Sequence, residues 1–223
     1  LQKSMKVVGF SFIKNAVEFD YPIVEAISSI LPLCDEFVVA VGNSSDKTRE
    51  LIESIDNKKI KIIDTIWNDE LREGGKVLAD ETNKALNNID NDTTWCFYIQ
   101  GDEVIHEKYL PAIEKAMKEY ENDEKVEGLL FNYTHFYGSY DFIGASRRWY
   151  RREIRIIRKN KNIFSYKDAQ GFRMKTSNDD TIGRKLNVRL IDATVYHYGW
   201  VKNPFLQQEK QKYFNRLWHD EQW

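Results

Sequence analysis

Apolar residues fall into short continuous runs that alternate with longer stretches in which they recur every three or four positions. The short runs are rich in β-branched and aromatic residues, a pattern typical of strands buried on both faces of a sheet. In the first hundred residues this predicts strands at 6–13, 36–41, 59–66 and 95–99. The spaced apolar positions between them predict helices from Pro22 to Leu31, around Leu51 to Ile55, and over 75–89. Strands and helices that alternate in this way predict right-handed crossovers and an α/β fold with a mostly parallel, Rossmann-like central sheet flanked by helices.

The rhythm changes after residue 103. A charged amphipathic stretch predicts a helix over 107–120, and a second one predicts a closing helix over 204–218. The strands expected between them are 126–136, 153–158, 163–166 and 186–196, and the aromatic, glycine-containing stretch 137–150 is expected to be a long loop near a site. We therefore predict one domain, 1–223, in which an α/β half (5–105) precedes a mixed half (106–223) that shapes the pocket for a second substrate.

Composition narrows the class of protein. The chain has 223 residues, of which 42% are apolar and 13% aromatic, so it can form a real core and is not a disordered segment. Its 33 basic and 35 acidic residues give a net charge of −2, so no global field favours nucleic acid or a membrane. Cys34 and Cys96 lie among apolar residues, which favours buried free thiols in a reducing compartment. With no apolar run near the ~20 residues that span a bilayer and no signal-peptide pattern, we expect a soluble cytoplasmic protein.

The run from Trp95 breaks off into Gln100-Gly101-Asp102-Glu103. In open α/β sheets ligands bind outside the carboxyl ends of the strands, so these carboxylates occupy a position where chemistry is usually done. Gly101 lets the backbone come close to a ligand, and Asp102 and Glu103 offer the oxygen ligands that suit Mg²⁺ or Mn²⁺. The alternative is an ordinary turn after a strand, since Gly and Asp are common turn residues.

Four landmarks occur in order along the first half of the chain. They are Phe12-Ile13-Lys14-Asn15; Asp35 to Thr48 (DEFVVAVGNSSDKT); Trp67-Asn68-Asp69 with Thr82-Asn83-Lys84-Ala85-Leu86; and Trp95 to Glu103. Together they resemble the GT-A domain of bacterial family 2 glycosyltransferases. The resemblance covers roughly residues 5 to 105, and the remainder fits only loosely.

This resemblance implies an enzyme that moves a sugar from a nucleotide-sugar to an acceptor hydroxyl, with inversion and with the help of Mn²⁺ or Mg²⁺. It implies a glycan, lipid-linked or protein acceptor, a place in cell-surface polysaccharide synthesis, and peripheral contact with the inner face of the membrane. The positions that correspond to donor-binding residues are Phe12, Ile13, Asn15, Asn43, Asn83, Gln100 and Gly101.

The chain departs from the family pattern at two positions. Val41 replaces an Asp that contacts the base or ribose, and Gln100 replaces the first Asp of the Asp-x-Asp motif. A glutamine can hydrogen-bond a ribose or phosphate but brings no charge to a cation. Asp102 is therefore the expected metal ligand, with Glu103 either assisting catalysis or turned inward to hold the loop.

Two further residues complete the predicted site. His197 is the second expected metal ligand, because imidazole suits Mn²⁺-class ions and family members often use a late His; it could instead pack against its aromatic neighbours. Asp168, in a Gly-bearing turn after a strand, is the expected general base, and a surface turn carboxylate is the alternative.

Basic residues form two groups. Arg72 and Lys76 flank Gly74-Gly75 before a predicted helix, where an anion would meet both charges and a helix N-terminus, unless this is merely a solvated helix start. The second group could hold a nucleic acid, but the near-neutral net charge, the lack of a nucleic-acid motif and an Arg/Ile alternation argue against it; its members are Arg147, Arg148, Arg151, Arg152, Arg155, Arg158 and Lys159. We expect this group to lie beside a diphosphate site or to meet an anionic acceptor.

Two other functions fit parts of the sequence. A sugar-phosphate nucleotidyltransferase shares a similar sheet, but it needs a Gly-rich basic loop after the first strand, which 11–17 (SFIKNAV) lacks. A degenerate nucleotide-sugar fold kept as a binding module would explain Val41 and Gln100.

Overall fold

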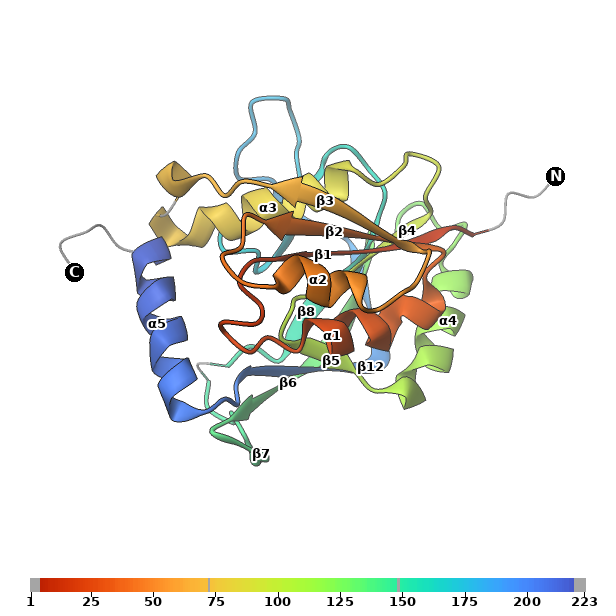
Figure 1. Ribbon diagram of the computed structural model, residues 1–223. Helices are drawn as coiled ribbons and strands as arrows, with labels where there is room; N and C mark the ends of the chain where they lie inside the picture. Colours follow the sequence, from red (N-terminus) through yellow and green to blue (C-terminus); the bar gives the residue numbers. More distant parts are fainter. Residues whose placement is uncertain (1–4, 72, 148, 219–223) are drawn as a thin grey trace.

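The computed structural model describes residues 5–71, 73–147 and 149–218. The first half has the predicted alternation of strands and helices (Figure 1). Its elements are β1 (Val7–Ile13), α1 (Ile23–Ile30), β2 (Glu36–Gly42), α2 (Thr48–Glu53), β3 (Ile60–Thr65), α3 (Lys76–Asn87) and β4 (Trp95–Tyr98). Short 3-10 turns lie at Leu31–Leu33, Asp69–Leu71, Glu73–Gly75 and Glu107–Tyr109.

The second half is richer in strands than the sequence predicts. Its elements are β5 (Glu103–Ile105), α4 (Leu110–Glu119), β6 (Gly128–Tyr137), β7 (Ser139–Ile143), β8 (Arg152–Arg158), β9 (Ile163–Tyr166), β10 (Gly171–Met174), β11 (Arg184–Lys185), β12 (Val188–Trp200) and α5 (Pro204–Trp218). The prediction of a loop over 137–150 was wrong in part, because β7 pairs with β6 inside it. The strand predicted to end at Tyr196 runs on to Trp200, so His197 lies within a strand.

The main sheet has the strand order β3-β2-β1-β4-β8-β6-β12-β5, with β7 added to β6. The four strands of the first half are parallel, whereas β8 joins both β4 and β6 in antiparallel pairs. The sheet is therefore mixed over its second half, as predicted. Antiparallel pairing of β12 with β5 sets His197 opposite Glu103, which brings the end of β12 beside the turn that follows β4.

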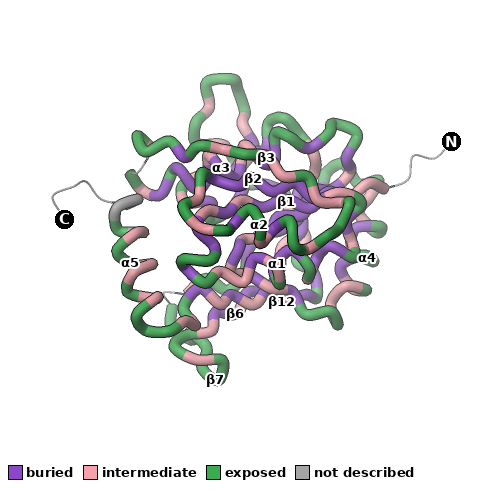
Figure 2. Tube along the Cα trace, in the orientation of Figure 1, coloured by how far each residue is buried: buried purple, intermediate pink, exposed green. Residues whose placement is uncertain are grey.

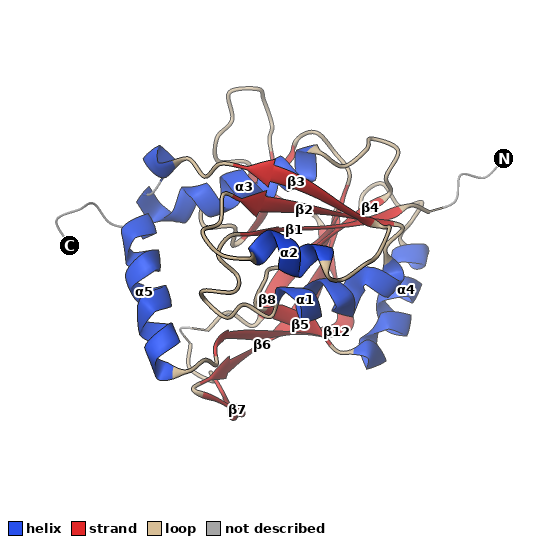
Figure 3. Ribbon diagram, viewed as in Figure 1, coloured by secondary structure: helices blue, strands red, loops and turns tan. Residues whose placement is uncertain are grey.

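Side chains that alternate along the parallel strands enter two separate hydrophobic cores. Trp95 and Phe97 of β4 pack with α1 and α4, whereas Cys96 and Tyr98 pack with α3, β9 and β10. Figure 2 shows the strands as a buried layer, and Figure 3 shows helices on either side of it. The runs predict this burial because a strand covered on both faces needs apolar residues at every position.

The structure also describes the two cysteines and the apolar character of the helices. Cys34 and Cys96 are both buried free thiols, as the sequence predicts. Within the described part of the chain, no helix is both long and apolar enough to cross a membrane.

Candidate active site

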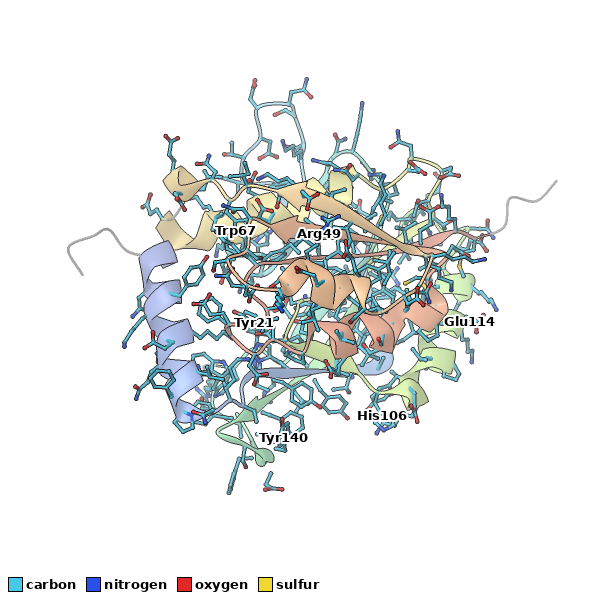
Figure 4. The ribbon with its side chains drawn as sticks, viewed as in Figure 1. Tyr21, Arg49, Trp67, His106, Glu114 and Tyr140 are labelled. Atoms are coloured by element: carbon cyan, nitrogen blue, oxygen red, sulfur yellow. The ribbon has the colours of Figure 1, made fainter. Side chains whose placement is uncertain are left out.

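A cavity of about 630 Å³ lies where the carboxyl ends of the parallel strands meet α5. Phe12 and Ile13 come from the end of β1, and Gln100 to Asp102 follow β4. The opposite wall comes from the end of β12 and from α5, which stands beside these strand ends (Figure 1). Tyr21 and Trp67, two aromatic residues of the lining, are labelled in Figure 4 on the side of the sheet toward α5.

Seven of the predicted site residues line this one cavity: Phe12, Ile13, Gln100, Gly101, Asp102, Asp168 and His197. They come from positions up to 185 residues apart, so the fold and not local sequence brings them together. Arg72 lies outside the described residues. The remaining predicted residues are described but are not part of the lining: Asn15, Asn43, Lys76, Asn83 and Glu103.

Two of these asparagines hold turns and strands in place. Asn15 adopts a left-handed backbone (φ 52°), and its side chain accepts from the Ser45 amide at 3.0 Å and donates to Glu18 at 2.7 Å. Asn83 joins α3 to β9, since its amide nitrogen donates to the Ser165 carbonyl at 3.0 Å and its oxygen accepts from the Ser165 amide at 2.8 Å.

Asn43 and Lys76, two other predicted site residues, face solvent. Asn43 is exposed, and its backbone amide donates to Thr65 at 2.9 Å. Lys76 is an exposed lysine at the start of α3, 3.6 Å from Glu73. The helix start at Gly75 is therefore solvated at Lys76, in line with the alternative that the sequence left open.

One end of the cavity is charged. Asp102 Oδ2 lies 3.4 Å from Nε2 of His197 and 3.3 Å from Nζ of Lys210. Lys210 also donates to the Gly199 carbonyl at 3.1 Å. Gly199 must be small, because a Cβ there would come within 2.5 Å of Asp102 Oδ2 and 2.7 Å of His197 Nε2. We call Asp102, His197, Lys202 and Lys210 the pocket cluster.

Charges in the pocket cluster shift the pKa values of Asp102 and Lys202. Burial alone would raise the pKa of Asp102, yet His197, Lys210 and Lys202 together hold it well below its usual range. Burial, together with the charge of Lys210, lowers the pKa of Lys202 to about 8. The ammonium groups of both lysines lie 4.8 Å from the ring centre of Tyr21, which places two positive charges on one aromatic side chain.

Hydrogen bonding orients His197. Burial and the neighbouring His197 lower the pKa of His135 to about 4, so His135 is neutral near pH 7. Its Nε2 lies 3.2 Å from the Tyr150 carbonyl and must donate there, which leaves its Nδ1 to accept from Nδ1 of His197 at 3.3 Å. His197 Nε2 then points at Asp102, and a hydrogen or a cation is needed between these two electron-rich atoms.

A divalent cation at this place would meet a competitor. The separation of Asp102 Oδ2 and His197 Nε2, 3.4 Å, suits two atoms that each bind one ion at about 2 Å. However, Lys210 already lies against the same oxygen, and like unit charges about 4 Å apart repel by about 4 kcal/mol at an effective dielectric constant of 20, twice that for a dication. The described residues contain no group of three or more His, Cys, Asp and Glu side chains that could hold a metal. In this structure the ammonium of Lys210 occupies the place beside Asp102 Oδ2 that a metal ion would need.

Glu103 is turned inward, one of the two orientations that the sequence allowed. It is fully buried and accepts from Arg155 Nε at 2.8 Å and Nη2 at 2.5 Å, from the Gln100 amide at 3.0 Å, and from the Tyr133 hydroxyl. We call Glu103, Arg155, Tyr133 and Glu153 the sheet cluster; Glu153 lies 3.8 Å from Arg155. Every lone-pair direction of Glu103 is thus used within the protein, which suits a residue that holds the turn in place.

Asp168 reaches the cavity from a strained turn. Lys167 and Ala169 on either side of it have left-handed backbones, with φ of 55° and 63°. Non-glycine residues in this region cost of order 1–3 kcal/mol and are found disproportionately at functional sites. Asp168 is half-buried, and this burial raises its pKa above the usual range. Gln100 fixes the turn, since its amide nitrogen donates to the Ala169 carbonyl at 3.3 Å.

Two polar atoms of the cavity lining are buried without a hydrogen-bond partner among the described residues. They are the indole nitrogen of Trp67, a donor, and the side-chain oxygen of Gln207, an acceptor. A buried polar group left unpaired costs about 1–3 kcal/mol. A ligand with polar groups of both kinds would recover this energy.

Several residues of the lining were not found from the sequence. Lys210 of the lining, and Lys202 beside Tyr21, carry no local signal, because they look like ordinary charges near a surface helix. His135 lacked sequence context and is explained only by its register opposite His197 in the β6–β12 pair. The aromatic content of 137–150 was the one usable signal, and it correctly indicated a segment near the site: Trp149 and Tyr150 line the cavity together with Trp200.

The arginine-rich group does not form one surface. Arg155 is buried against Glu103, and Arg158 donates to the carbonyls of Glu121 and Val126 at 2.8 and 3.0 Å. Lys159 donates to the Leu86 carbonyl at 2.8 Å. Arg155 alone of these three lines the cavity, and Arg148 lies outside the described residues.

Comparison with solved structures shows a GT-A-like fold, as the sequence predicts. The chain is similar to TarS from S. aureus, with a TM-score of 0.56 and 15% identity over 94% of this chain and 39% of TarS. It is also similar to S. aureus TarS 1–349, with a TM-score of 0.54 and 14% identity over 96% of this chain and 65% of that one.

A complex of TarS 1–349 with UDP gives a TM-score of 0.53 and 15% identity, with the same 96% and 65% coverage. The chain thus spans about two fifths of TarS and just under two thirds of TarS 1–349. Comparisons with protein-family models and with curated protein sequences give no match. At this identity the likeness is one of fold, and the activity must be argued from the site.

Proposed function

We propose that the chain is a glycosyltransferase that moves a sugar from a nucleoside-diphosphate sugar to an acceptor hydroxyl. The observation that carries this proposal is that seven residues predicted from the resemblance line one cavity at the carboxyl edge of a GT-A-like sheet. If the resemblance were accidental, we would expect these residues to lie in different parts of the molecule. Only the fold brings Phe12, Asp102 and His197 together.

The chemistry of the lining matches the parts of such a donor. Phe12 and Trp67, with ring centres 6.0 Å apart, offer an apolar surface for a base, and the unpaired Trp67 nitrogen offers a donor to it. The pocket cluster offers positive charge to the diphosphate. We assign the wall formed by Trp149, Tyr150 and Trp200 to the transferred sugar and the acceptor.

The reaction we propose is a single displacement. The acceptor oxygen bonds to the anomeric carbon on the face opposite the diphosphate, whose oxygen leaves with the electron pair of the broken bond, so the configuration inverts. Asp168 takes the acceptor's proton, a task that its raised pKa suits. The resemblance implies a divalent cation as the Lewis acid for the leaving diphosphate, and Asp102 and His197 are the side chains that could hold one, but the positive charge already at this place is that of Lys210.

The acceptor class follows from the same resemblance. We propose a glycan, lipid-linked or protein acceptor, with cell-surface polysaccharide synthesis as the setting. Several large apolar side chains near the β6–β7 hairpin are exposed, among them Tyr140 and Phe142, at 69% and 68%. They offer apolar surface to such an acceptor or to a membrane surface.

Nucleotide binding tests the proposal. The melting temperature of the chain would be measured with UDP, GDP, CDP and dTDP, each in EDTA and in Mn²⁺. UDP is tested first, because TarS 1–349 has been solved with it. A ligand at 100 times its Kd stabilises the native state by about 2.7 kcal/mol, which for a chain of this size raises the melting temperature by several degrees. If none of the four shifts the midpoint in either condition, the proposal is wrong.

A further inference from the structure

We infer that the ammonium of Lys210 is the cation that binds the donor diphosphate, in the place where the resemblance puts a divalent metal. This inference rests on the proposed function, because it names the group that neutralises the leaving diphosphate in that reaction. It also makes nucleotide binding independent of metal.

The position of Lys210 is built by two separate parts of the fold. α5 carries the lysine, the turn after β4 supplies Asp102 Oδ2 at 3.3 Å, and the end of β12 supplies the Gly199 carbonyl at 3.1 Å. The lysine side chain is only 12% exposed and lines the cavity. A long, mobile side chain is therefore held at one point, beside the carboxylate on which a metal would depend.

The donor set around this point is poor for a metal and sufficient for a lysine. Gln100, which stands where the family has a carboxylate, is neutral and spends its amide nitrogen on Tyr98 and Ala169. Asp102 and Asp168 are the carboxylates among the described residues of the lining. A metal thus finds one carboxylate and one imidazole, whereas an ammonium is satisfied by the carboxylate and the Gly199 carbonyl.

The balance of charge also favours an anion. Lys202 joins Lys210 at the ring of Tyr21 while it donates to the Asp20 carbonyl, so the positive charge of two lysines acts on Asp102. Like charges near each other in a partly buried site repel each other, and a diphosphate bound in the cavity at Lys210 reduces that repulsion. A dication added to the same place would increase it.

The test compares two lysines of the same helix. Binding of UDP and of inorganic pyrophosphate to the whole chain would be measured by calorimetry in EDTA and in Mn²⁺, for the wild type, Lys210→Met and Lys212→Met. Lys212 is the matched control, since it lies two residues away, is 67% exposed and pairs with Glu209. We expect wild-type UDP binding in EDTA, at least a tenfold weaker Kd in Lys210→Met, an unchanged Kd in Lys212→Met, and substantial recovery in Lys210→Arg.

UDP binding by the variant Asp102→Asn distinguishes a lysine cation from a metal cation, and it does so without a change at Lys210. If Lys210 is the cation, removing the negative charge leaves UDP binding in EDTA unchanged or tighter. If a metal is the cation, binding requires Mn²⁺ in the wild type and is lost in Asp102→Asn. Binding that appears only with Mn²⁺ and survives in Lys210→Met overturns the inference and leaves the proposed function intact, whereas the absence of nucleotide binding in every condition overturns the proposed function itself.

Discussion

Asp102 and Glu103 are adjacent carboxylates, yet they belong to regions of opposite character. Glu103 lies in the sheet cluster, where every acceptor direction is filled by Arg155, Tyr133 or a backbone amide and no part of it is exposed. Asp102 lies in the pocket cluster, at the edge of an open cavity, with more positive than negative charge around it. Charge that is buried and fully paired maintains a structure, whereas charge in imbalance at a cavity is available to a ligand.

Arg155→Met should lower the free energy of unfolding more than any other variant of the two clusters. It leaves Glu103 ionised or protonated in the interior without its two guanidinium bonds, and breaking a buried ion pair by removing one partner costs about 3–5 kcal/mol. Chemical denaturation would show this loss as a lower midpoint at an unchanged slope.

Arg49→Met is the control for removing an arginine. Arg49 pairs with Glu53 at 3.0 Å on the surface, where both side chains are about half exposed, and such pairs contribute about 0–1 kcal/mol. If Arg155→Met and Arg49→Met lowered the free energy of unfolding equally, the sheet cluster would contribute no more to stability than a surface ion pair.

Sequence reasoning predicted most of this architecture, and about half of the predicted site residues lie in the cavity. The parallel half could be predicted because buried strands and amphipathic helices leave periodic patterns, and the end of β4 was recognised because its Gly and two acids interrupt an apolar run. The partners of Glu103 and Asp102 could not be predicted. Arg155 and Lys210 lie 52 and 108 residues away from them, and only the fold brings them close, through strand pairing for Arg155 and through the position of α5 for Lys210.

Short-range pattern also does not show how several predicted side chains are held. Asn15 and Asn83 occupy family landmark positions, but their amides are spent on turns and on the α3–β9 junction. His197 was expected after a strand and lies within one, because the β6–β12 register continues past the predicted end. Polar residues in a motif show that the local geometry matters, but not which atoms face the ligand.

Glu153 of the sheet cluster should contribute one pH-dependent term to the stability. Burial raises the pKa of Glu153 to about 7, against an ordinary value near 4.3 in the unfolded chain. Between these values the folded protein binds a proton that the unfolded chain has lost, so stability falls as the pH rises through this window, by about 4 kcal/mol at most. Above pH 7 the term is constant.

Glu153→Gln isolates this term. His135 contributes in the opposite direction: its folded pKa of about 4 lies below the usual 6.5, so its stabilising effect is lost as the pH falls through that range. The difference in unfolding free energy between wild type and Glu153→Gln, measured from pH 4.5 to 7.5, removes the His135 term. A flat difference would show that Glu153 is already ionised in the fold.

Among the variants of the two clusters, Asp102→Asn should have the smallest effect on stability, about 1 kcal/mol. Removing this carboxylate separates Lys210 and Lys202 from their counter-charge, but the site opens into the cavity, where water takes over part of the interaction. A double-mutant cycle of Asp102→Asn with Lys210→Met would give the coupling directly, and we expect it to weaken as salt is raised from 0.05 to about 0.5 M because partly hydrated charges are screened. The coupling of Glu103 with Arg155, shielded from solvent, should hardly change over the same range. A salt-insensitive coupling of 3 kcal/mol or more between Asp102 and Lys210 would place the pocket cluster in the same structural class as the sheet cluster, and the contrast between the two adjacent carboxylates would disappear.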